Sequence, residues 1–240
     1  MVMEKYRDYS RGIIELLNKI TENQPITKIA SMIADSIEDY NIFHIIGTGA
    51  HGSMAAEELL WRGGGIAAVN CILDSSINLI YGAERSGVFD QLGCYAASIL
   101  DCYDVRKGEL LIIVNSAGVN MFSIELAREC RHRGIKTIGI TCAMGADNGV
   151  DCLLNEVDLW IDNYMPTGDS MVSVEGLEQT VGSVSSVINL AIVNMCVVAV
   201  VEELIRRGIE PPVWKYDYCP GAAENNQRMF AQYSKRAKFL

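Results

Sequence analysis

Residues 109–120 read ELLIIVNSAGVN, and residues 41–53 read NIFHIIGTGAHGS. Each stretch is a short apolar run followed directly by glycine and small polar residues. Such a run is typical of a strand that is buried on both faces of a parallel sheet. These two stretches therefore predict buried strands at residues 109–114 and 41–46, and similar runs predict others at residues 66–73, 136–141 and 158–162.

Helical patterns lie between and around these strands. They predict helices over residues 53–62, 89–103, 121–132 and 183–207, and two more in the first forty residues, separated by Pro25. Strands that alternate with helices of about 10 to 15 residues predict an α/β fold with a mostly parallel sheet. No linker or internal repeat divides the chain. We therefore expect one domain over residues 1–240, with N-terminal helices in 1–40, an α/β core in 41–210 and a tail in 211–240.

The charge balance limits the class of partner. The chain has 240 residues and a formal charge of −10, which argues against nucleic acid or an anionic membrane as partner. An anionic ligand remains compatible with this charge because helix N-termini and backbone N–H groups bind phosphate. The charged N-terminal residues contain no apolar run, so we expect no signal peptide and a cytoplasmic location.

The cysteines and the most apolar stretch agree with that location. The eight cysteines form no CxxC pair and are accompanied by three histidines, so no metal site is predicted. Most lie in apolar runs, where reduced cysteine acts as a small hydrophobe. Residues 187–201 include Asn189 and Asn194 and look too short and too polar to span a membrane, so we expect a buried core or interface helix.

Three predicted strands end in loops rich in small and hydroxyl residues, at positions 47–53, 115–120 and 141–145. Ligands of open α/β sheets bind beyond the carboxyl ends of the strands. The first loop matches G-x-G-x-x-G at Gly47, Gly49 and Gly52, the spacing of dinucleotide sites. The next strand, however, has no acidic residue at its end to hold the ribose of NAD. A tight turn without a ligand is the alternative reading of the glycines.

The loop at 115–120 points more clearly to a ligand. It follows a buried strand, opens a helix, and places the Ser116 hydroxyl and several backbone N–H groups around one point. That arrangement suits a single phosphate monoester better than a pyrophosphate.

Four segments together resemble the SIS (sugar isomerase) domain, which comprises phosphosugar isomerases and phosphosugar-binding regulators. Two are GTGAHGSMAAEELLWRGG at 47–64 and IIVNSAGVNMFSIELARECRHRGIKTIGIT at 112–141. The other two, DNYMPTGDSMVSVEGLEQTVGSVSSVINLAIVN at 162–194 and RRGIEPPVW at 206–214, resemble a branch of uncharacterised, phosphoheptose isomerase-like SIS proteins. The resemblance covers nearly the whole chain.

The resemblance implies a three-layer α/β/α sandwich with a five-stranded parallel sheet in flavodoxin-like order. It also implies a homodimer or tetramer, a phosphorylated sugar as ligand, and sites near subunit interfaces. Both ligand loops depart from the branch, whose members read Gly-x-Gly-His-Ser-His and Asn-Ser-Gly-x-Asn. Here each loop is one residue longer and one histidine is missing. The two changes indicate either an altered ligand or a site that has lost its chemistry.

The resemblance also assigns catalytic candidates. Aldose–ketose isomerisation needs a carboxylate base, and the segment from Glu58 to Arg62 resembles the Glu-Leu-x-Gly-Arg segment whose Glu is that base in phosphoheptose isomerases. We therefore expect Glu58, or else Glu57, to be the base, and His51 to act as an acid or to bind a hydroxyl group. In the alternative reading both glutamates are solvated helix charges, with Glu58 paired to Arg62.

Ser116, Gly118 and Asn120 are the strongest candidates for phosphate contact. Ser183 and Ser185 either cap the long helix or add hydroxyls to the phosphate site, and Asp169 either contacts sugar hydroxyls or is a solvated loop residue. The full set expected to bind phosphate or sugar is Gly47, Thr48, Gly49, Ser53, Asn115, Ser116, Gly118, Asn120, Thr141, Ser183, Ser185 and Asp169. His44, within a strand, is expected to be a satisfied core residue, and His132 a solvated one.

Three functions follow from this reading. The leading one is a sugar-phosphate isomerase that needs no organic cofactor. The second is a phosphosugar-binding sensor without turnover, which the loop changes favour. The third is a lyase or etherase acting on an N-acetyl sugar phosphate.

Overall fold

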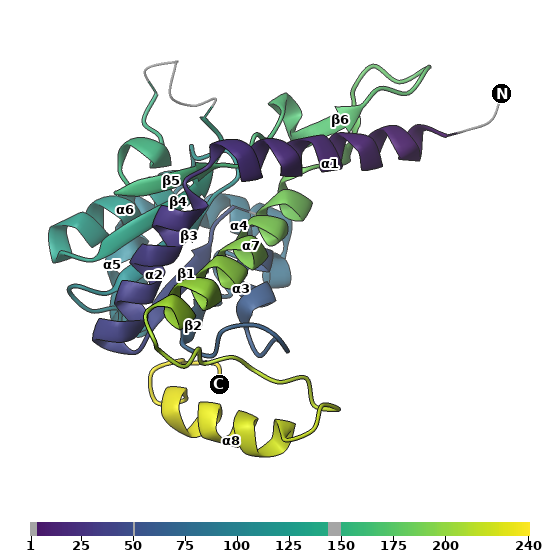
Figure 1. Ribbon diagram of the computed structural model, residues 1–240. Helices are drawn as coiled ribbons and strands as arrows, with labels where there is room; N and C mark the ends of the chain where they lie inside the picture. The colour runs from purple at the N-terminus through teal and green to yellow at the C-terminus, as the bar shows by residue number, and fades with distance from the viewer. Residues whose placement is uncertain (1–3, 50, 144–149) are drawn as a thin grey trace.

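The computed structural model describes residues 4–49, 51–143 and 150–240, and its centre is a parallel sheet (Figure 1). The strands are β1 (Phe43–Gly47), β2 (Val69–Ile72), β3 (Leu110–Val114), β4 (Lys136–Thr141) and β5 (Leu159–Asp162). Their order is β2-β1-β3-β4-β5. Every residue of β1, β2 and β3 is buried, as expected for Ile- and Val-rich strands covered on both faces. The predicted five-stranded sheet in flavodoxin-like order is confirmed.

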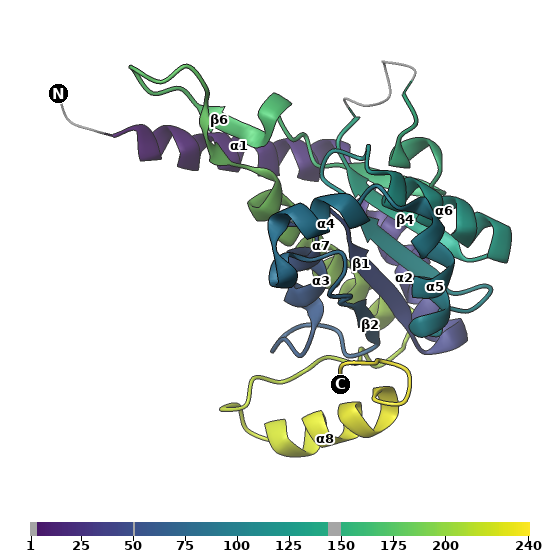
Figure 2. The same cartoon turned by 180° about the vertical axis from the view of Figure 1, so that it is seen from behind.

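Helices cover both faces of the sheet and complete the predicted three layers. One face carries α2 (Ile26–Tyr40), α3 (Ser53–Leu59) and α7 (Ser185–Arg206), while α1 (Lys5–Asn23) extends beyond the body of the molecule (Figure 1). The view from behind shows α4 (Ala83–Phe89), α5 (Ala96–Cys102) and α6 (Met121–Arg133) on the other face (Figure 2). Separate hydrophobic clusters fill the two interfaces. Five of the eight cysteines are buried, as expected for small hydrophobes.

Helix α7 agrees with the helix predicted over 183–207, but its apolar part is longer than the stretch 187–201 suggested. It has 22 residues and a mean hydropathy of 2.0 over its most apolar window, so by length and composition alone it is long and apolar enough to cross a membrane. The prediction that this stretch is too short and too polar was therefore wrong. In the structure α7 packs against α2 and α3, and Ile188, Ile192 and Leu204 are fully buried. Its role as a core helix agrees with the prediction.

Several elements escaped the sequence analysis, and α4 is one of them except for its last residue, Phe89. A hairpin of β6 (Ser170–Val172) and β7 (Val181–Ser183) lies beside α1, where the Tyr9 hydroxyl donates to the Ser183 carbonyl at 2.7 Å. Helix α8 (Ala222–Tyr233) lies in the C-terminal tail, below the sheet in Figure 1. These elements are short or amphipathic, and they are stabilised by packing against segments that are distant in the sequence.

Two predicted helices are shorter than expected. The helix predicted over 89–103 is split into the end of α4, a 3-10 turn (η2, Gly93–Tyr95) and α5. At Gly93 the chain lies so close to α6 that an added Cβ would be 2.4 Å from Glu125 Cγ. The helix predicted over 53–62 ends at Leu59, because Leu60 is extended and Trp61 adopts a left-handed φ of 50°. The split helix places Asp90 in a turn rather than within a helix.

A buried polar cluster joins the amino edge of the sheet to the C-terminal tail. His44 Nε2 lies 2.8 Å from Glu109 Oε2, and Asn70 Nδ2 lies 3.1 Å from His44 Nδ1. The Asn70 amide thus lies on the Nδ1 side of the His44 ring and the Glu109 carboxylate on the Nε2 side. Arg236 donates to Glu109 Oε1 at 2.8 Å, and the Arg106 backbone N–H donates to Oε2. His44 is thus the satisfied core histidine that its position in a strand predicted, and His132 is exposed.

Glu109 is expected to be the most sensitive residue of this cluster. Burial favours the protonated carboxyl, but hydrogen bonds from His44, Arg236 and the Arg106 N–H outweigh it and lower the pKa of Glu109 below 4.5. Glu109→Gln leaves Arg236 and His44 without a buried carboxylate, so we expect it to lower the free energy of unfolding at pH 7 by about 3 kcal/mol. Urea denaturation measures this loss.

The pH dependence supplies the check. A carboxyl whose pKa is lowered by folding stabilises the protein above its unfolded pKa, and this stability is lost as the pH falls through the folded pKa. The difference between the wild type and Glu109→Gln should therefore shrink in acid, and a pH-independent difference would contradict the assignment. Glu210→Gln, which removes an exposed pair with Arg228, is the matched control and should scarcely change stability.

Candidate functional site

The sheet register brings the two predicted ligand loops together. Gly47, the last residue of β1, pairs with Val114, the last residue of β3, and the Thr48 N–H donates to the Val114 carbonyl at 2.8 Å. Beyond these ends lies an open cleft of about 550 Å³. Its lining residues are Thr48, Gly49, His51, Gly52, Asp90, Asn115, Ser116, Ala117, Asn120, Met165, Gly168, Asp169 and Ser185. The cleft occupies the carboxyl edge of the sheet, where α/β folds bind ligands.

The Asn115 side chain holds the two loops in place. Its Nδ2 donates to Thr48 Oγ1 at 2.8 Å and to Asn120 Oδ1 at 3.0 Å, and its Oδ1 accepts from the Gly118 N–H at 2.7 Å. The side chain is only 1% exposed, so these bonds are shielded from water. Asn115 therefore acts by positioning Thr48 and Asn120, and the amide has no further donor for a ligand.

Ser116 is oriented from the opposite side by two asparagines. Asn189, on α7, donates from Nδ2 to Ser116 Oγ at 2.9 Å, and Asn163 donates to both Asn189 Oδ1 and the Ser116 carbonyl. Because its oxygen accepts from Asn189, the Ser116 hydroxyl keeps its own proton for a ligand. Sequence analysis did not name Asn163 or Asn189 as site residues. The signal for Asn189 was its polar side chain within an apolar helix.

The side chain of Asp169 accepts hydrogen bonds at the N-terminus of α7. Its Oδ1 accepts from the N–H groups of Val184 and Ser185, at 3.2 and 2.7 Å, and its Oδ2 accepts from the Ser185 hydroxyl at 2.7 Å. A carboxylate at a helix N-terminus is stabilised by the helix dipole. Asp169 and Ser185 thus both line the cleft and are bonded to each other, whereas Ser183 lies in β7 and is not among the lining residues.

Asp90 is the functional candidate that sequence analysis missed. It is 4% exposed, lines the cleft, and accepts the Gly49 N–H on Oδ1 at 3.0 Å. Burial raises the pKa of the Asp90 carboxyl, although the bond from Gly49 opposes this shift. A carboxyl with a raised pKa in a cleft is suited to proton transfer. No local motif marks Asp90, because the chain brings it to Gly49 from 41 residues away.

The three predicted catalytic residues do not lie together. His51 is exposed and lines the cleft, but Glu57 and Glu58 are not among its lining residues. Glu58 Oε1 accepts from Asn194 Nδ2 on α7 at 3.1 Å and lies 3.4 Å from Arg62 Nε. Within one chain Glu58 is therefore held between α3 and α7, and Glu57 is exposed to solvent.

The glycines of the first loop have a packing explanation. A Cβ on Gly47 would lie 1.8 Å from the Gly52 carbonyl oxygen, and one on Gly52 would lie 2.2 Å from the Thr48 carbonyl oxygen. The turn closes only when both residues lack a side chain, and the Gly49 N–H is taken by Asp90. The spacing of these glycines thus needs no dinucleotide to explain it.

The remaining predicted residues lie behind the cleft. Ser53 and Thr141 are buried, and neither they nor Gly47 and Gly118 are among the lining residues. Thr141 Oγ1 has no hydrogen-bond partner among the described residues. Residues 144 and 145 of the third predicted loop lie outside the described residues. Within residues 4–49, 51–143 and 150–240, no three His, Cys, Asp or Glu side chains are grouped as metal ligands would be.

Comparisons with known proteins agree with this geometry. A family model described as "SIS domain" matches residues 6–142. A UPF0309 protein of Caldanaerobacter subterraneus subsp. tengcongensis is 32% identical over 243 residues, covering 97% of this chain and 98% of that protein. A UPF0309 protein of Brucella anthropi is 34% identical over 220 residues and covers 90% of each chain.

Solved structures share the fold at low sequence identity. A phosphoheptose isomerase from Francisella tularensis has a TM-score of 0.57 at 14% identity, covering 83% of this chain and 98% of that one. The Vibrio vulnificus NanR protein, solved in complex with ManNAc-6P, has a TM-score of 0.53 at 14% identity, covering 96% of this chain and 70% of that one.

A substitution at Gly118 tests the packing of the second ligand loop against Thr141. Its φ is 71°, and an added Cβ would lie 2.3 Å from Thr141 Oγ1 and 3.5 Å from Thr141 Cβ. We expect Gly118→Ala to destabilise the protein by about 2 kcal/mol or more, from left-handed strain and the clash. In the double variant with Thr141→Ala the clash is absent, so stability should recover by about 1 kcal/mol relative to additivity. Thermal and urea unfolding of the four proteins measure the coupling, and strict additivity would contradict this packing.

Proposed function

Because this chain belongs to the SIS domain family, we propose that it binds a phosphorylated sugar in the cleft at the carboxyl edge of its sheet. The observation that carries this proposal is the arrangement of donors around Ser116. The Ser116 carbonyl accepts from the Cys142 N–H and from Asn163 Nδ2. The N–H groups of Ser116 and Ala117 have no acceptor among the described residues, and the Ser116 proton is available. Such clustered donors suit a phosphate group.

Carboxylates in the same cleft suit the sugar part of the ligand. Asp90 and Asp169 both line it, and each still has oxygen lone pairs that accept from sugar hydroxyls. Thr48, Gly49 and Asn120 complete the proposed contacts, and Gly118 and Thr141 support the loop from behind. The shared fold with phosphoheptose isomerases and with NanR, whose solved complex contains ManNAc-6P, guides the choice of sugar phosphates to test.

Aldose–ketose isomerisation is the activity that we propose for this cleft. His51, an exposed residue of the first loop, is the proposed acid for ring opening. Two carboxyls compete for the role of base: Asp90, which lies in the cleft of its own chain, and Glu58, which lies outside it. Glu58 acts in this scheme only if a second copy of the chain brings it to a neighbouring cleft.

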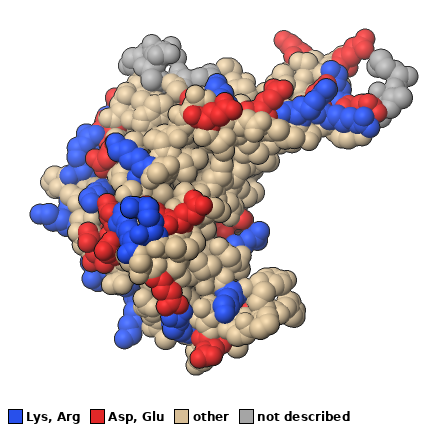
Figure 3. Space-filling view, viewed as in Figure 1, with Lys and Arg blue, Asp and Glu red and all other residues tan. Residues whose placement is uncertain are grey.

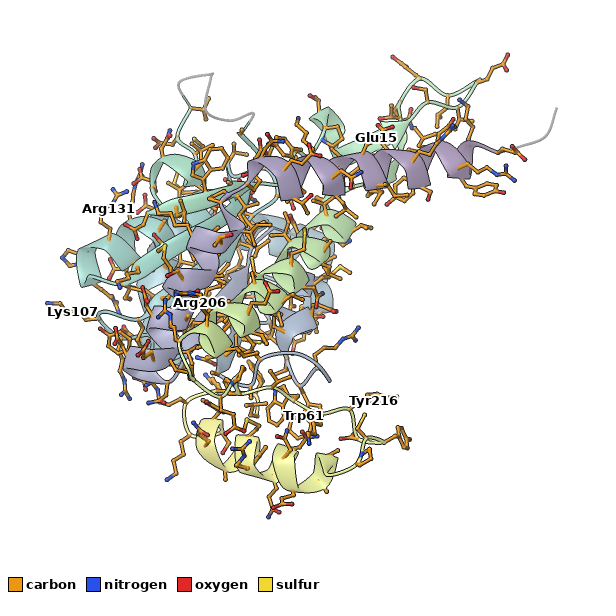
Figure 4. All side chains as sticks on the ribbon, viewed as in Figure 1. Glu15, Trp61, Lys107, Arg131, Arg206 and Tyr216 are labelled. Carbon is orange, nitrogen blue, oxygen red and sulfur yellow. The ribbon has the colours of Figure 1, made fainter. Side chains whose placement is uncertain are left out.

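An exposed apolar face supports assembly into a homodimer or tetramer. Val187, Val198 and Ile205 of α7 are 44%, 62% and 61% exposed. Figure 3 shows few charged side chains just below α1, over the upper part of α7, whereas charged side chains gather at its lower end, where Figure 4 labels Arg206. Exposed apolar patches of this kind mark interaction sites. We propose that α7 lies at or near the interface between subunits.

A sensor without turnover is the second candidate, and one observation favours it. Both carboxylate oxygens of Asp169 accept hydrogen bonds at the start of α7, Asp90 is bonded to Gly49, and neither predicted glutamate lines the cleft. The cleft thus has ample groups to recognise a ligand and only one buried carboxyl suited to act as a base.

Removing the Ser116 hydroxyl tests the phosphate site. In a thermal-shift series with aldose and ketose phosphates of five to seven carbons, we expect at least one to raise the melting temperature of the wild type. Ser116→Ala removes a hydrogen bond to a charged group and should weaken that ligand about tenfold. Ser183→Ala is the matched control, since Ser183 lies outside the lining, and should bind as the wild type does. If both variants bind the sugar phosphate equally well, the assignment of the phosphate site to the Ser116 loop is wrong.

Solvent exchange separates an isomerase from a sensor. An enediol intermediate exchanges the proton at C2, so NMR in D2O should show deuterium at C2 of a turned-over sugar phosphate. We expect Asp90→Asn to abolish exchange if Asp90 is the base and Glu58→Gln to abolish it if Glu58 is. Binding without exchange in the wild type would reject isomerisation and leave the sensor.

A further inference from the structure

A second pocket, of about 430 Å³, lies far from the phosphosugar cleft. Its walls come from the loop after α3, with Trp61 and Arg62, and from the segment before α8, with Trp214 to Asp217. These segments are joined by bridge pairing between Ile66 and Val213, just before β2 begins. The pocket is therefore at the amino edge of the sheet, whereas the cleft is at the carboxyl edge. Figure 4 shows Trp61 and Tyr216 between the sheet and α8.

The backbone conformation of Trp61 is energetically unfavourable. It is 50% exposed and its backbone has a φ of 50°, a left-handed conformation that is unfavourable for a bulky residue. Its ring centroid lies 4.7 Å from that of buried Trp214 and 6.1 Å from that of Phe230, contacts that hold the ring in position. Strained residues that are held in this way cluster at binding sites. The half-exposed indole offers an aromatic surface to a ligand.

Cations lie beside this aromatic wall. Lys215 and Arg62 both line the pocket. No described carboxylate lies within ion-pair distance of Lys215 Nζ, and Arg62 meets Glu58 through Nε alone, at 3.4 Å. Both cations can thus meet an anion. Asp217, held by Asn226 Nδ2 at 3.3 Å, provides an acceptor at the same pocket.

We propose that this pocket binds a mononucleotide, with the base stacked on Trp61 and the phosphate between Lys215 and Arg62. A nucleobase stacked on an aromatic ring is a favourable contact that every base can make, because each base has a π face. The two cations that line the pocket add recognition of phosphate, which a neutral saccharide on the same rings would not need. Asp217 accepts from a ribose hydroxyl or an exocyclic amine. The chain's charge of −10 disfavours a nucleic-acid strand and is compatible with a single small anion.

Tryptophan fluorescence measures ligand binding at this pocket directly, because Trp61 and Trp214 line it. The chain has three tryptophans, and Trp160→Phe removes the one that lies in β5, leaving the pair in the pocket. We expect AMP to quench this variant saturably, adenosine to quench it more weakly, and ribose 5-phosphate and a neutral disaccharide to leave it unquenched. In the same background Lys215→Glu should weaken AMP binding about tenfold or more. Trp61→Leu should remove most of the quenching and weaken binding measured by calorimetry.

The controls separate this pocket from the cleft. Ser116→Ala should bind AMP as the parent does, and Lys215→Glu should keep the thermal response to sugar phosphates. The proposal is overturned if AMP does not bind, if the disaccharide binds in its place, or if Lys215→Glu leaves the AMP affinity unchanged. It is also overturned if Lys215→Glu alters the sedimentation of the protein while AMP has no effect, because the pocket would then be a contact between copies.

Discussion

The buried amide of Asn115 is the contact on which the carboxyl edge of the molecule depends. One side chain bonds Thr48 after β1, and Gly118 and Asn120 after β3, so both loops take a single arrangement. The adjacent ends of β1 and β3 make this contact geometrically available. From it follow the position of Ser116, its alignment by Asn189, and the shape of the cleft between these loops and α7.

The phosphate that we propose for this cleft would be bound by donors that carry no formal charge, on a chain whose net charge is −10. The proposed donors are the Ser116 hydroxyl and neighbouring backbone N–H groups, whereas the N-terminus of α7, which could otherwise bind an anion, donates to Asp169. This distribution fits a ligand with one phosphate and several hydroxyl groups better than one with several phosphates. The burial that raises the pKa of Asp90 gives the same cleft a group suited to proton transfer.

The two edges of the sheet are built by different means. At the amino edge the His44–Glu109–Arg236 network is buried and ties the tail to the strands. The tail in turn carries Trp214 and Tyr216 to the loop that follows α3, and so creates the aromatic pocket. Arg62 lines this pocket and also contacts Glu58 on α3. The aromatic pocket is therefore connected to α3, the helix that follows the first ligand loop.

The sequence by itself determined the five strands of the parallel sheet, most of the helices and the two ligand loops, because apolar periodicity, glycines and hydroxyl residues act over a few neighbouring positions. The strand order came from resemblance to a family, and the structure confirms it. Only the tertiary structure placed Asp90 beside Gly49, aligned Ser116 through Asn163 and Asn189, and left Glu58 outside the cleft. These outcomes depend on side chains that meet across long stretches of chain, and no local pattern encodes which distant groups will share a buried hydrogen bond.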